Sequence, residues 1–441
     1  MAGAILKGYF LYPILESAQG RSIRPKLRAL KKDSGISFPQ RLELIKKRLS
    51  ALVQSAGDHV PYYRDLFRKL GFKPSNLEKD LAYLNDLPYL TKEMVREQGE
   101  KILDERLNRT ALQVRKTGGA TGPAVPIYYD QEALDWTAAS NLFVLEWTGK
   151  KRHHREVHFS SRFPEIFPLQ DRIKERIKCM ALNRVNIVTD SFDADSFAAI
   201  WQKLKRARPY LVQGYPSTLY ALALFMKKSG KDGTGVIKVF ESTGEVLDKN
   251  KKDAIESVFG CRIFNRYGSA EFGVVAHETE SSGALKVLDF MVYPENYQSE
   301  EGKEIVLTGL TNHAMPLIRY RTGDMGKLVT AEDGFYFESI RGRVHDLVPI
   351  GGRKYPTHYI QDLLNRIGGI DEFQIEIRDG RSVLRLVVAD PAYQDAIERR
   401  IKSWWDGMEV EFTDFNGLQR SGARDKFRYV VPQRTNLGTD R

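Results

Sequence analysis

Residues 262–271 read Arg-Ile-Phe-Asn-Arg-Tyr-Gly-Ser-Ala-Glu, and they divide into two parts. The first part, residues 262–265, is a short apolar run that follows a helical pattern ending at Gly260. A helix, a glycine and a short strand in this order indicate an α/β fold. The second part, Tyr267 to Glu271, is polar and lies at the carboxyl end of the predicted strand. Open α/β sheets bind ligands there, so these residues form a first candidate site.

Strands and helices alternate on both sides of this stretch. Short apolar runs at residues 157–160, 210–212 and 236–240 are separated by helical patterns, one near residues 197–204 and one after Pro216. This alternation predicts an α/β core with substantial parallel sheet, over about residues 111–342.

The first 110 residues are expected to be mainly helical. Leu42, Ile45, Leu49, Leu52 and Val53 recur at helical spacing. A threonine at position 91 is suited to cap a short helix over residues 92–98.

A small α+β unit is predicted at the carboxyl end. Apolar residues alternate over residues 373–377 and 384–388, and Asp379-Gly380 between them is a favoured two-residue hairpin turn. A helix over residues 392–404 and a strand over residues 409–412 complete this unit. We therefore expect a large domain of residues 1–342 and a small, mobile one of residues 343–441, with the boundary at residues 342–346.

Composition narrows the class of protein. The chain has 441 residues, and its longest apolar stretches, such as residues 219–226, are far shorter than the ~20 residues that cross a bilayer. The N-terminus lacks the pattern of a signal peptide, so a cytoplasmic protein without a transmembrane segment is expected. Cys179 and Cys261 are far apart and lack metal-site spacing, and both are interpreted as buried thiols.

The formal net charge of +11 is spread over several basic segments. Nothing in the sequence resembles a nucleic-acid-binding motif, so no nucleic acid is expected as a partner. Solvated helix faces account for most of these charges. A phosphate-rich cofactor such as CoA, or an acidic acyl carrier protein, is compatible with the rest.

Two further segments carry polar residues suited to a nucleotide. Thr117-Gly-Gly-Ala-Thr-Gly-Pro123 can bring several backbone N–H groups against phosphate oxygens, although such a loop is also an ordinary connection. In Arg319-Tyr-Arg-Thr-Gly-Asp324 the carboxylate could accept both hydroxyls of a ribose, or the segment could be a hairpin turn. Glu271 could hold Mg²⁺, or it could be an acidic residue in the first turn of a helix.

The order of these segments resembles the adenylate-forming (acyl-CoA synthetase) superfamily. The glycine-rich loop is followed by Tyr-Gly-Ser-Ala-Glu, then Tyr-Arg-Thr-Gly-Asp, then Gly-Arg-Val-His-Asp at residues 342–346 and a late lysine. The resemblance covers about residues 42–431. Within it, residues 213–217, 241–245 and 426–431 look most like phenylacetate-CoA ligase and its CapK-like relatives from capsule biosynthesis.

The resemblance implies a role for each matching residue. ATP or AMP would be bound by Thr117, Gly118, Gly119, Ala120, Thr121, Gly122, Ser242, Gly244, Glu245, Tyr267, Gly268, Ser269 and Asp324. Glu271 would bind Mg²⁺, and Arg343 would lie near the ribose and phosphate. Lys426 would be the lysine that the small domain brings to the carboxylate and α-phosphate, about a hinge at His345. The acid pocket would be formed by Tyr215, Pro216, Ser242, Thr243, Gly244 and Tyr267.

The resemblance further implies a reaction in two halves. ATP activates a carboxylic acid, aryl or a related small acid, as its acyl-AMP, and the small domain then rotates to admit a thiol of CoA or of a carrier-protein phosphopantetheine arm. A homodimer is expected from the closer relatives. One alternative ends with transfer to an amine or hydroxyl. Another is a weakened nucleotide-binding scaffold, suggested by Gly118, Ala120, Ala270 and Asp425 where relatives carry other residues.

Overall fold

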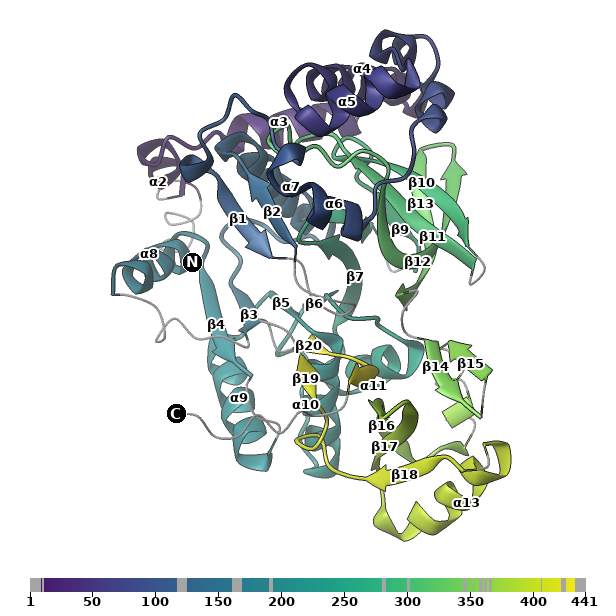
Figure 1. The fold of residues 1–441 in the computed structure, drawn as a ribbon. Coiled ribbons are helices and arrows are strands. Elements are labelled where there is room, and N and C mark those ends of the chain that lie inside the picture. Colours follow the sequence, from purple (N-terminus) through teal and green to yellow (C-terminus); the bar gives the residue numbers. More distant parts are fainter. Residues whose placement is uncertain are drawn as a thin grey trace.

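A central sheet of 11 strands organises the large domain. The structure is a computed structural model, and it describes residues 9, 12–116, 125–160, 169–189, 193–279, 283–299, 302–343, 347–351, 353–356, 360, 363–364, 367–405, 407–421 and 426–432. Figure 1 shows helices α4 and α5 at one end of the large domain and the small domain, β14 to β18 with α13, at the other. The expected α/β fold class with two domains agrees with this architecture.

The described N-terminal segment is mainly helical, as the sequence predicts. Thr91 caps the last of its α-helices, because its side chain accepts a hydrogen bond from the backbone N–H of Met94. Pro39 lies in the first turn of the longest helix, where its missing N–H costs no hydrogen bond. The helices are α2 (Tyr12–Ala18), α3 (Ile23–Ser34), α4 (Phe38–His59), α5 (Pro61–Leu70) and α6 (Lys92–Gln98), with 3₁₀ turns η2 (Pro74–Glu78), η3 (Leu81–Asp86), η4 (Gly99–Ile102) and η5 (Arg109–Ala111).

The sheet has a parallel and an antiparallel half that meet at β7. The strand order is β10-β11-β12-β13-β9-β8-β7-β6-β5-β3-β4. The parallel half consists of β3 (Glu156–Ser160), β4 (Arg184–Val188), β5 (Leu211–Gly214), β6 (Val239–Thr243) and β7 (Arg262–Ser269). The antiparallel half consists of β8 (Gly273–Glu278), β9 (Leu285–Val287), β10 (Val292–Ser299), β11 (Gly302–Gly309), β12 (Tyr320–Ala331) and β13 (Gly334–Arg343).

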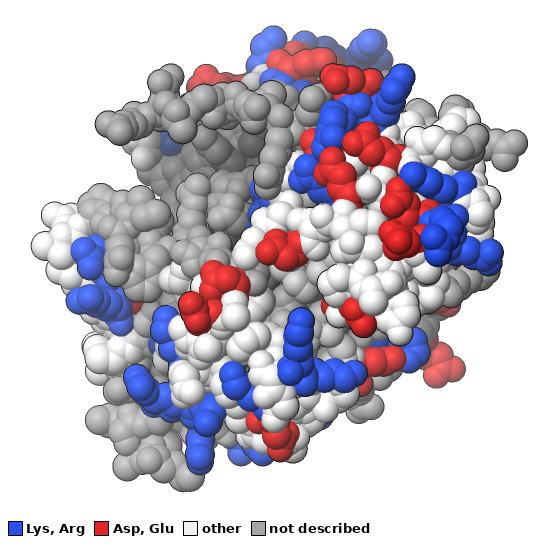
Figure 2. Space-filling view, turned by 90° about the horizontal axis from the view of Figure 1, so that it is seen from below, with Lys and Arg blue, Asp and Glu red and all other residues white. Residues whose placement is uncertain are grey.

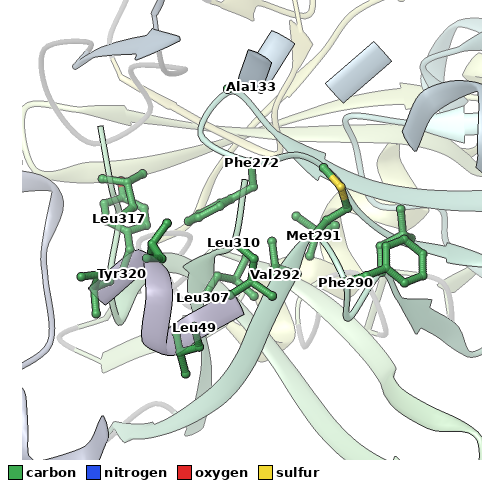
Figure 3. Close-up of a cluster of buried hydrophobic side chains, with 14 of the residues drawn as sticks. Leu49, Ala133, Phe272, Phe290, Met291, Val292, Leu307, Leu310, Leu317 and Tyr320 are labelled. Carbon is green, nitrogen blue, oxygen red and sulfur yellow. The ribbon is translucent and has the colours of Figure 1, made fainter. Parts of the chain in front are cut away.

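Each half of the sheet has its own core. The helices near the parallel strands are α8 (Leu169–Ala181), α9 (Ala194–Ala207), α10 (Pro216–Lys228) and α11 (Lys249–Phe259), and a core of buried side chains lies between the last three and the sheet. The second core joins the N-terminal helices and α7 (Gln131–Trp147) to the antiparallel strands. Figure 3 shows Leu49 of α4 near Val292, Leu307 and Leu310, so a helix from the first sixty residues covers strands some 250 residues later. A separate two-stranded sheet is formed by β1 (Gln113–Lys116) and β2 (Pro126–Tyr129).

Arg319 fixes the start of β12, the strand that carries Asp324. Its buried guanidinium pairs with Glu295 at 2.8 Å and donates to the backbone oxygen of Leu87 at 2.6 Å. Its φ of 52° is uncommon for a side-chain-bearing residue, and these contacts hold it there. The first residue of this motif therefore has a structural role, and the residues after it lie in a strand, not in the hairpin turn that was the alternative.

The small domain contains the predicted hairpin. Strands β16 (Ile370–Arg378) and β17 (Arg381–Val388) pair around Asp379 and Gly380, whose φ angles of 50° and 78° suit a tight two-residue turn. The other elements are β14 (Leu347–Ile350), β15 (Arg353–Pro356), η7 (Pro391–Tyr393), α13 (Gln394–Trp404), β18 (Glu409–Phe412), β19 (Arg420–Ser421), β20 (Lys426–Phe427) and β21 (Val430–Pro432). The domain boundary at residues 342–346 stays a prediction.

Three local expectations were wrong. Cys179 is only half-buried, unlike Cys261. The strand expected at residues 236–240 begins at Val239. Tyr267 to Ser269 lie within β7 and not after it, because pairing with β8 extends this strand beyond its apolar part.

The surface carries charges of both signs. On the face shown in Figure 2, basic side chains are interspersed with acidic ones. Among the described residues, no helix has the length and apolar character that a membrane span requires.

Candidate active site

Tyr267 and Asp324 meet although three strands of the sheet, β13, β9 and β8, lie between β7 and β12. The hydroxyl of Tyr267 donates to Oδ2 of Asp324 at 2.6 Å. The sheet curls enough for the ring of Tyr267 to contact Phe337 of β13 edge-on, with the ring centroids 6.0 Å apart. Burial raises the pKa of Tyr267 well above its usual value, and the carboxylate of Asp324 raises it further. The tyrosine therefore stays a neutral donor that orients this carboxylate.

Glu271 lies in the turn between β7 and β8, so the alternative of a helix N-terminus is wrong. Its Oε1 accepts a hydrogen bond from the hydroxyl of Tyr320 at 3.3 Å. The hydroxyl of Tyr129 lies 2.6 Å from the backbone oxygens of both Ala270 and Glu271. The turn is thereby held on two sides, and it carries its carboxylate to the same region of the sheet as Asp324.

Gly268 belongs to the narrowest part of this hairpin. A Cβ atom added at Gly268 would lie 2.5 Å from the backbone oxygen of Gly273, closer than real Cβ atoms approach. Only glycine fits there, because the obstacle is backbone and cannot move aside as a flexible side chain would. The requirement for glycine in the Tyr-Gly-Ser-Ala-Glu segment thus has a steric cause.

Glu245 joins the large domain to the strand that contains Lys426. Its Oε2 accepts the backbone N–H of Ser217, in the first turn of α10, at 3.2 Å. Its Oε1 accepts the backbone N–H of Phe427 at 2.9 Å. Figure 1 shows the result, with β19 and β20 beside α10 and α11 and apart from the rest of the small domain. The backbone of Lys426 is therefore one residue from a contact with the segment that contains Gly244.

A buried ion cluster forms a second contact between the domains. Lys251 of α11 lies 2.8 Å from Glu372 of β16 and 3.4 Å from Asp248, and its Nζ donates to the hydroxyl of Tyr429. The side chains of Lys251 and Glu372 are only 5% and 4% exposed. Burial alone would lower the pKa of Lys251, but the neighbouring Glu372 and Asp248 raise it well above its usual value. Lys251 is therefore charged at this interface. Nearby, Tyr220 of α10 donates to the backbone oxygen of Asp371 at 2.9 Å.

Beneath the candidate site, Glu241 of β6 links three strands of the sheet. It is fully buried and accepts a hydrogen bond from Gln213, lies 3.0 Å from Nε2 of His277 and 3.5 Å from the guanidinium of Arg266. Burial would raise the pKa of Glu241, but Arg266, His277 and Gln213 outweigh it and lower the pKa to about 2. The carboxylate thus joins β6 to β5, β7 and β8, and β6 and β7 carry the site residues Ser242 and Tyr267.

Three buried hydroxyls near this edge lack a hydrogen-bond partner among the described residues. They belong to Ser217 and Thr218 in the first turn of α10 and to Ser242 at the end of β6. Buried polar groups are normally satisfied, so unpaired hydroxyls indicate a position where a ligand or water binds. Tyr215, which precedes α10, Pro216 and Thr243 flank these hydroxyls in the chain. The predicted acid pocket thus adjoins polar groups that could contact a bound molecule.

Several predicted site residues are not tested by side-chain geometry. Thr117 to Gly122 and His345 lie outside the described residues. For Arg343 and Lys426 the structure describes the backbone, and Arg343 pairs with Asp324 across β12 and β13. Among the catalytic residues proposed from the sequence, Glu271 is therefore the one whose side-chain contact the structure describes.

The sequence analysis missed Lys251 and the role of Glu241. Lys251 lies four residues before Ile255 and eight before Phe259, so it occupies the buried stripe of its helix. A lysine in an apolar helical stripe is the signal that could have marked it as an interface residue.

Comparisons with known proteins agree with these observations. No family model matches the chain. It is 23% identical to the protein CapK of Staphylococcus aureus over 65% of this chain, and it spans 63% of the length of CapK. It is 23% identical to the phenylacetate-coenzyme A ligase of Escherichia coli K12, over 77% of this chain and 83% of that ligase.

The chain is thus similar to phenylacetate-CoA ligases and CapK, the branch of the adenylate-forming superfamily that the ordered motifs resemble, at 23% identity over 65% to 77% of its length. This similarity agrees with the family expected from the ordered motifs.

Solved structures share the fold of this chain. A 2-hydroxyisobutyryl-CoA ligase in its postadenylation state, in complex with an acyl-AMP, aligns with a TM-score of 0.70 at 20% identity over 90% of this chain and 91% of that one. The same ligase in its thioesterification state aligns with a TM-score of 0.59 at 22% identity, over 91% of each chain.

Proposed function

We propose that this protein is an AMP-forming acid–thiol ligase that activates a carboxylic acid with ATP and passes the acyl group to a thiol. The observation that carries the proposal is that three predicted site residues are held by contacts between distant elements: Tyr267 binds Asp324, Tyr320 binds Glu271, and Glu245 binds the backbone next to Lys426. These residues come from β12, from a turn and from the small domain. Similarity to phenylacetate-coenzyme A ligases supports the same activity.

In this proposal the nucleotide contacts the edge formed by β6, β7 and β12. Asp324 accepts the ribose hydroxyls, because a carboxylate has several acceptor positions and the hydroxyl of Tyr267 takes one of them. Gly244 and Glu245 pass the base, and Gly268 and Ser269 line the same edge. Thr117 to Gly122 contact the phosphates through backbone N–H groups.

Mg²⁺ fits the donor set at Glu271, since carboxylate and phosphate oxygens are the ligands this ion prefers. When bound, it would neutralise charge on the phosphates. The residues of the chain supply orientation: Tyr320 fixes the Glu271 carboxylate, and Arg343 lies near the ribose and phosphate. Lys426 approaches the substrate carboxylate and the α-phosphate, where a positive charge stabilises the charge that develops during the attack.

The first half-reaction forms one bond and breaks another. A carboxylate oxygen of the acid attacks the α-phosphorus in line, and the bond to the β-phosphate oxygen breaks, so that pyrophosphate leaves. The better alignment with the postadenylation state than with the thioesterification state supports assigning the observed domain arrangement to this half-reaction. Rotation about His345 would then admit the thiol of CoA, or of a phosphopantetheine arm on an acidic carrier protein, which displaces AMP.

The acid pocket is proposed at Tyr215, Pro216, Ser242, Thr243, Gly244 and Tyr267. The unpaired hydroxyl of Ser242 supports a ligand that brings a polar group to this position. An aryl or related small acid is the proposed substrate class, and CoA the proposed acceptor. The cytoplasmic location and the homodimer stay predictions.

The deciding experiment measures pyrophosphate released with Mg-ATP across a panel of aryl, fatty and amino acids, with and without CoA. Release with one acid class would support the proposal and name the substrate, and a stimulation by CoA would identify the acceptor. A matched Asp324→Asn variant should need a higher ATP concentration for the same release. Release that needs an amine or hydroxyl in place of CoA would support the alternative acceptor. Silence across the panel while ATP still binds would favour the scaffold.

A further inference from the structure

Helix α8 exposes apolar side chains on one face. Leu169, Ile173, Ile177 and Met180 are 69%, 48%, 37% and 46% exposed. They are spaced by four, four and three residues, so on an α-helix they form a single stripe over three turns. Ala181 is the residue of this helix that is buried. Large apolar side chains gathered on one exposed face mark an interaction site.

The attachment of α8 to the rest of the protein is polar. Glu175 and Cys179 lie on the far side of the helix from the stripe, and Asn186 of β4 donates to Glu175 at 3.3 Å. Asn186 also contacts the sulfur of Cys179 at 3.5 Å. The helix thus places its polar residues against the edge strand of the sheet and its apolar residues toward solvent, the reverse of an ordinary surface helix. Packing within the described domain does not account for the apolar stripe.

Basic residues border the stripe on both sides. At 100° per residue, Arg172 and Arg176 lie along one side of it and Lys174 along the other. With Lys178, Asp171 and Glu175 included, the helix has a net charge of +2. An apolar stripe with basic flanks is the pattern of helices that lie in the interface of an anionic membrane.

We propose that α8 docks the protein on an anionic lipid surface, with its apolar stripe among the acyl chains and its flanking basic residues at the lipid phosphates. A second copy of this chain is a poorer occupant, because the same basic flanks would repel each other across a symmetric contact. A protein partner is also less suited to a single projecting helix, since stable protein interfaces bury about 800 Å² on each side. Figure 1 shows α8 at the outer edge of the sheet, beside the edge strand β4.

The test is cosedimentation of the full chain with phosphatidylcholine vesicles, with and without phosphatidylglycerol. Binding is expected with the anionic vesicles and should weaken as salt is added, because salt screens the basic flanks. Ile173→Asn/Ile177→Asn should raise the lipid concentration for half-binding at least tenfold. The matched variant Leu70→Asn/Tyr393→Asn, which changes two exposed apolar residues elsewhere, should bind as the parent does.

A second pair of variants separates charge from apolar contact. Lys174→Glu/Arg176→Glu should lose binding to anionic vesicles, whereas Arg399→Glu/Lys402→Glu, with the same change in net charge on α13, should keep it. Circular dichroism and pyrophosphate release in the absence of lipid check that each variant is folded. Because vesicle binding requires no catalysis, it can fail while the proposed ligase activity stands, and the reverse.

Three outcomes would overturn the inference. The first is equal sedimentation with and without vesicles. The second is self-association of the parent chain in solution that Ile173→Asn/Ile177→Asn abolishes, which would assign the stripe to a second copy. The third is stripe-dependent binding of a purified acidic carrier protein without any binding to vesicles, which would assign it to a protein partner.

Discussion

Replacing Lys251 with methionine removes the positive charge at the domain interface and keeps a side chain of similar length. In the observed arrangement Glu372 is buried against Lys251 at 2.8 Å. Without its partner this carboxylate would remain buried and uncompensated, which in protein interiors costs about 3–5 kcal/mol. The small domain can relieve this cost by moving away and exposing Glu372 to water. The loss should therefore appear as a shift in the domain arrangement.

A shift of about 3 kcal/mol corresponds to roughly a 100-fold fall in the ratio of docked to undocked small domain. Hydrogen exchange at the backbone N–H of Phe427 reports this ratio directly, since Glu245 accepts that N–H in the docked arrangement. Protection of this N–H should fall with Lys251→Met. Pyrophosphate release should fall with it, and thioester formation from supplied acyl-AMP should fall less.

Two further variants make the argument refutable. Lys249→Met lies on the same helix with its side chain 84% exposed, and it should leave the exchange unchanged. Lys251→Met/Glu372→Met removes both charges, and it should recover most of the protection because no buried charge is left unpaired. The reasoning would be refuted if the backbone N–H of Phe427 exchanged equally fast in Lys251→Met and Lys249→Met. It would also be refuted if this N–H exchanged faster in the double variant than in Lys251→Met.

Four other predictions concern the site itself. Lys426→Ala should depress acyl-AMP formation by orders of magnitude and spare thioester formation from supplied acyl-AMP, and equal loss in both half-reactions would contradict its assigned role. Asp324→Asn should chiefly raise the apparent Kd for ATP in a titration, and an unchanged value would argue against ribose contact. The pKa of Glu241 is lowered to about 2, so the charged form stabilises the fold above its unfolded pKa near 4.5 and this contribution is lost as the pH falls. The free energy of unfolding should therefore fall less between pH 5 and pH 3 in Glu241→Gln than in the parent, by about 2 kcal/mol, as measured by denaturant titration. An equal fall in both proteins would contradict this prediction. Gly268→Ala should cost at least about 2 kcal/mol because its Cβ meets backbone, whereas Gly35→Ala, whose Cβ meets its nearest atom at 3.5 Å, should unfold like the parent.

Local patterns in the sequence predicted local structure well. The cap at Thr91 and the turn at Asp379-Gly380 depend on a few adjacent residues, and both are present. The contact between Tyr267 and Asp324 could not be predicted in the same way, because it requires the sheet to curl across the three strands that lie between β7 and β12. The extension of β7 through Ser269 likewise depends on its partner β8, which supplies hydrogen bonds that apolar patterning does not reveal.

The same difference between local patterns and long-range contacts applies to the functional residues. Asp324 and Glu271 were found from the order of short motifs, because this order can be read from the sequence without knowledge of the fold. Lys251 belongs to no such motif, and its importance comes from a partner, Glu372, more than a hundred residues away. The apolar stripe of α8 was also missed, since a helical apolar pattern by itself predicts burial and the structure shows exposure.

One carboxylate oxygen of Glu245 accepts a backbone N–H of the large domain, and the other accepts a backbone N–H of the small domain. Docking and binding near Glu245 are therefore coupled. A molecule that binds beside Gly244 and steadies Glu245 must favour the docked small domain. By reciprocity, docking must tighten the binding of that molecule by the same factor. A nucleotide affinity measured on this protein then depends on two equilibria, nucleotide binding and docking of the small domain. Glu245→Gln should change the ratio between the nucleotide affinities of the docked and undocked forms, while it leaves the other residues of each binding surface in place.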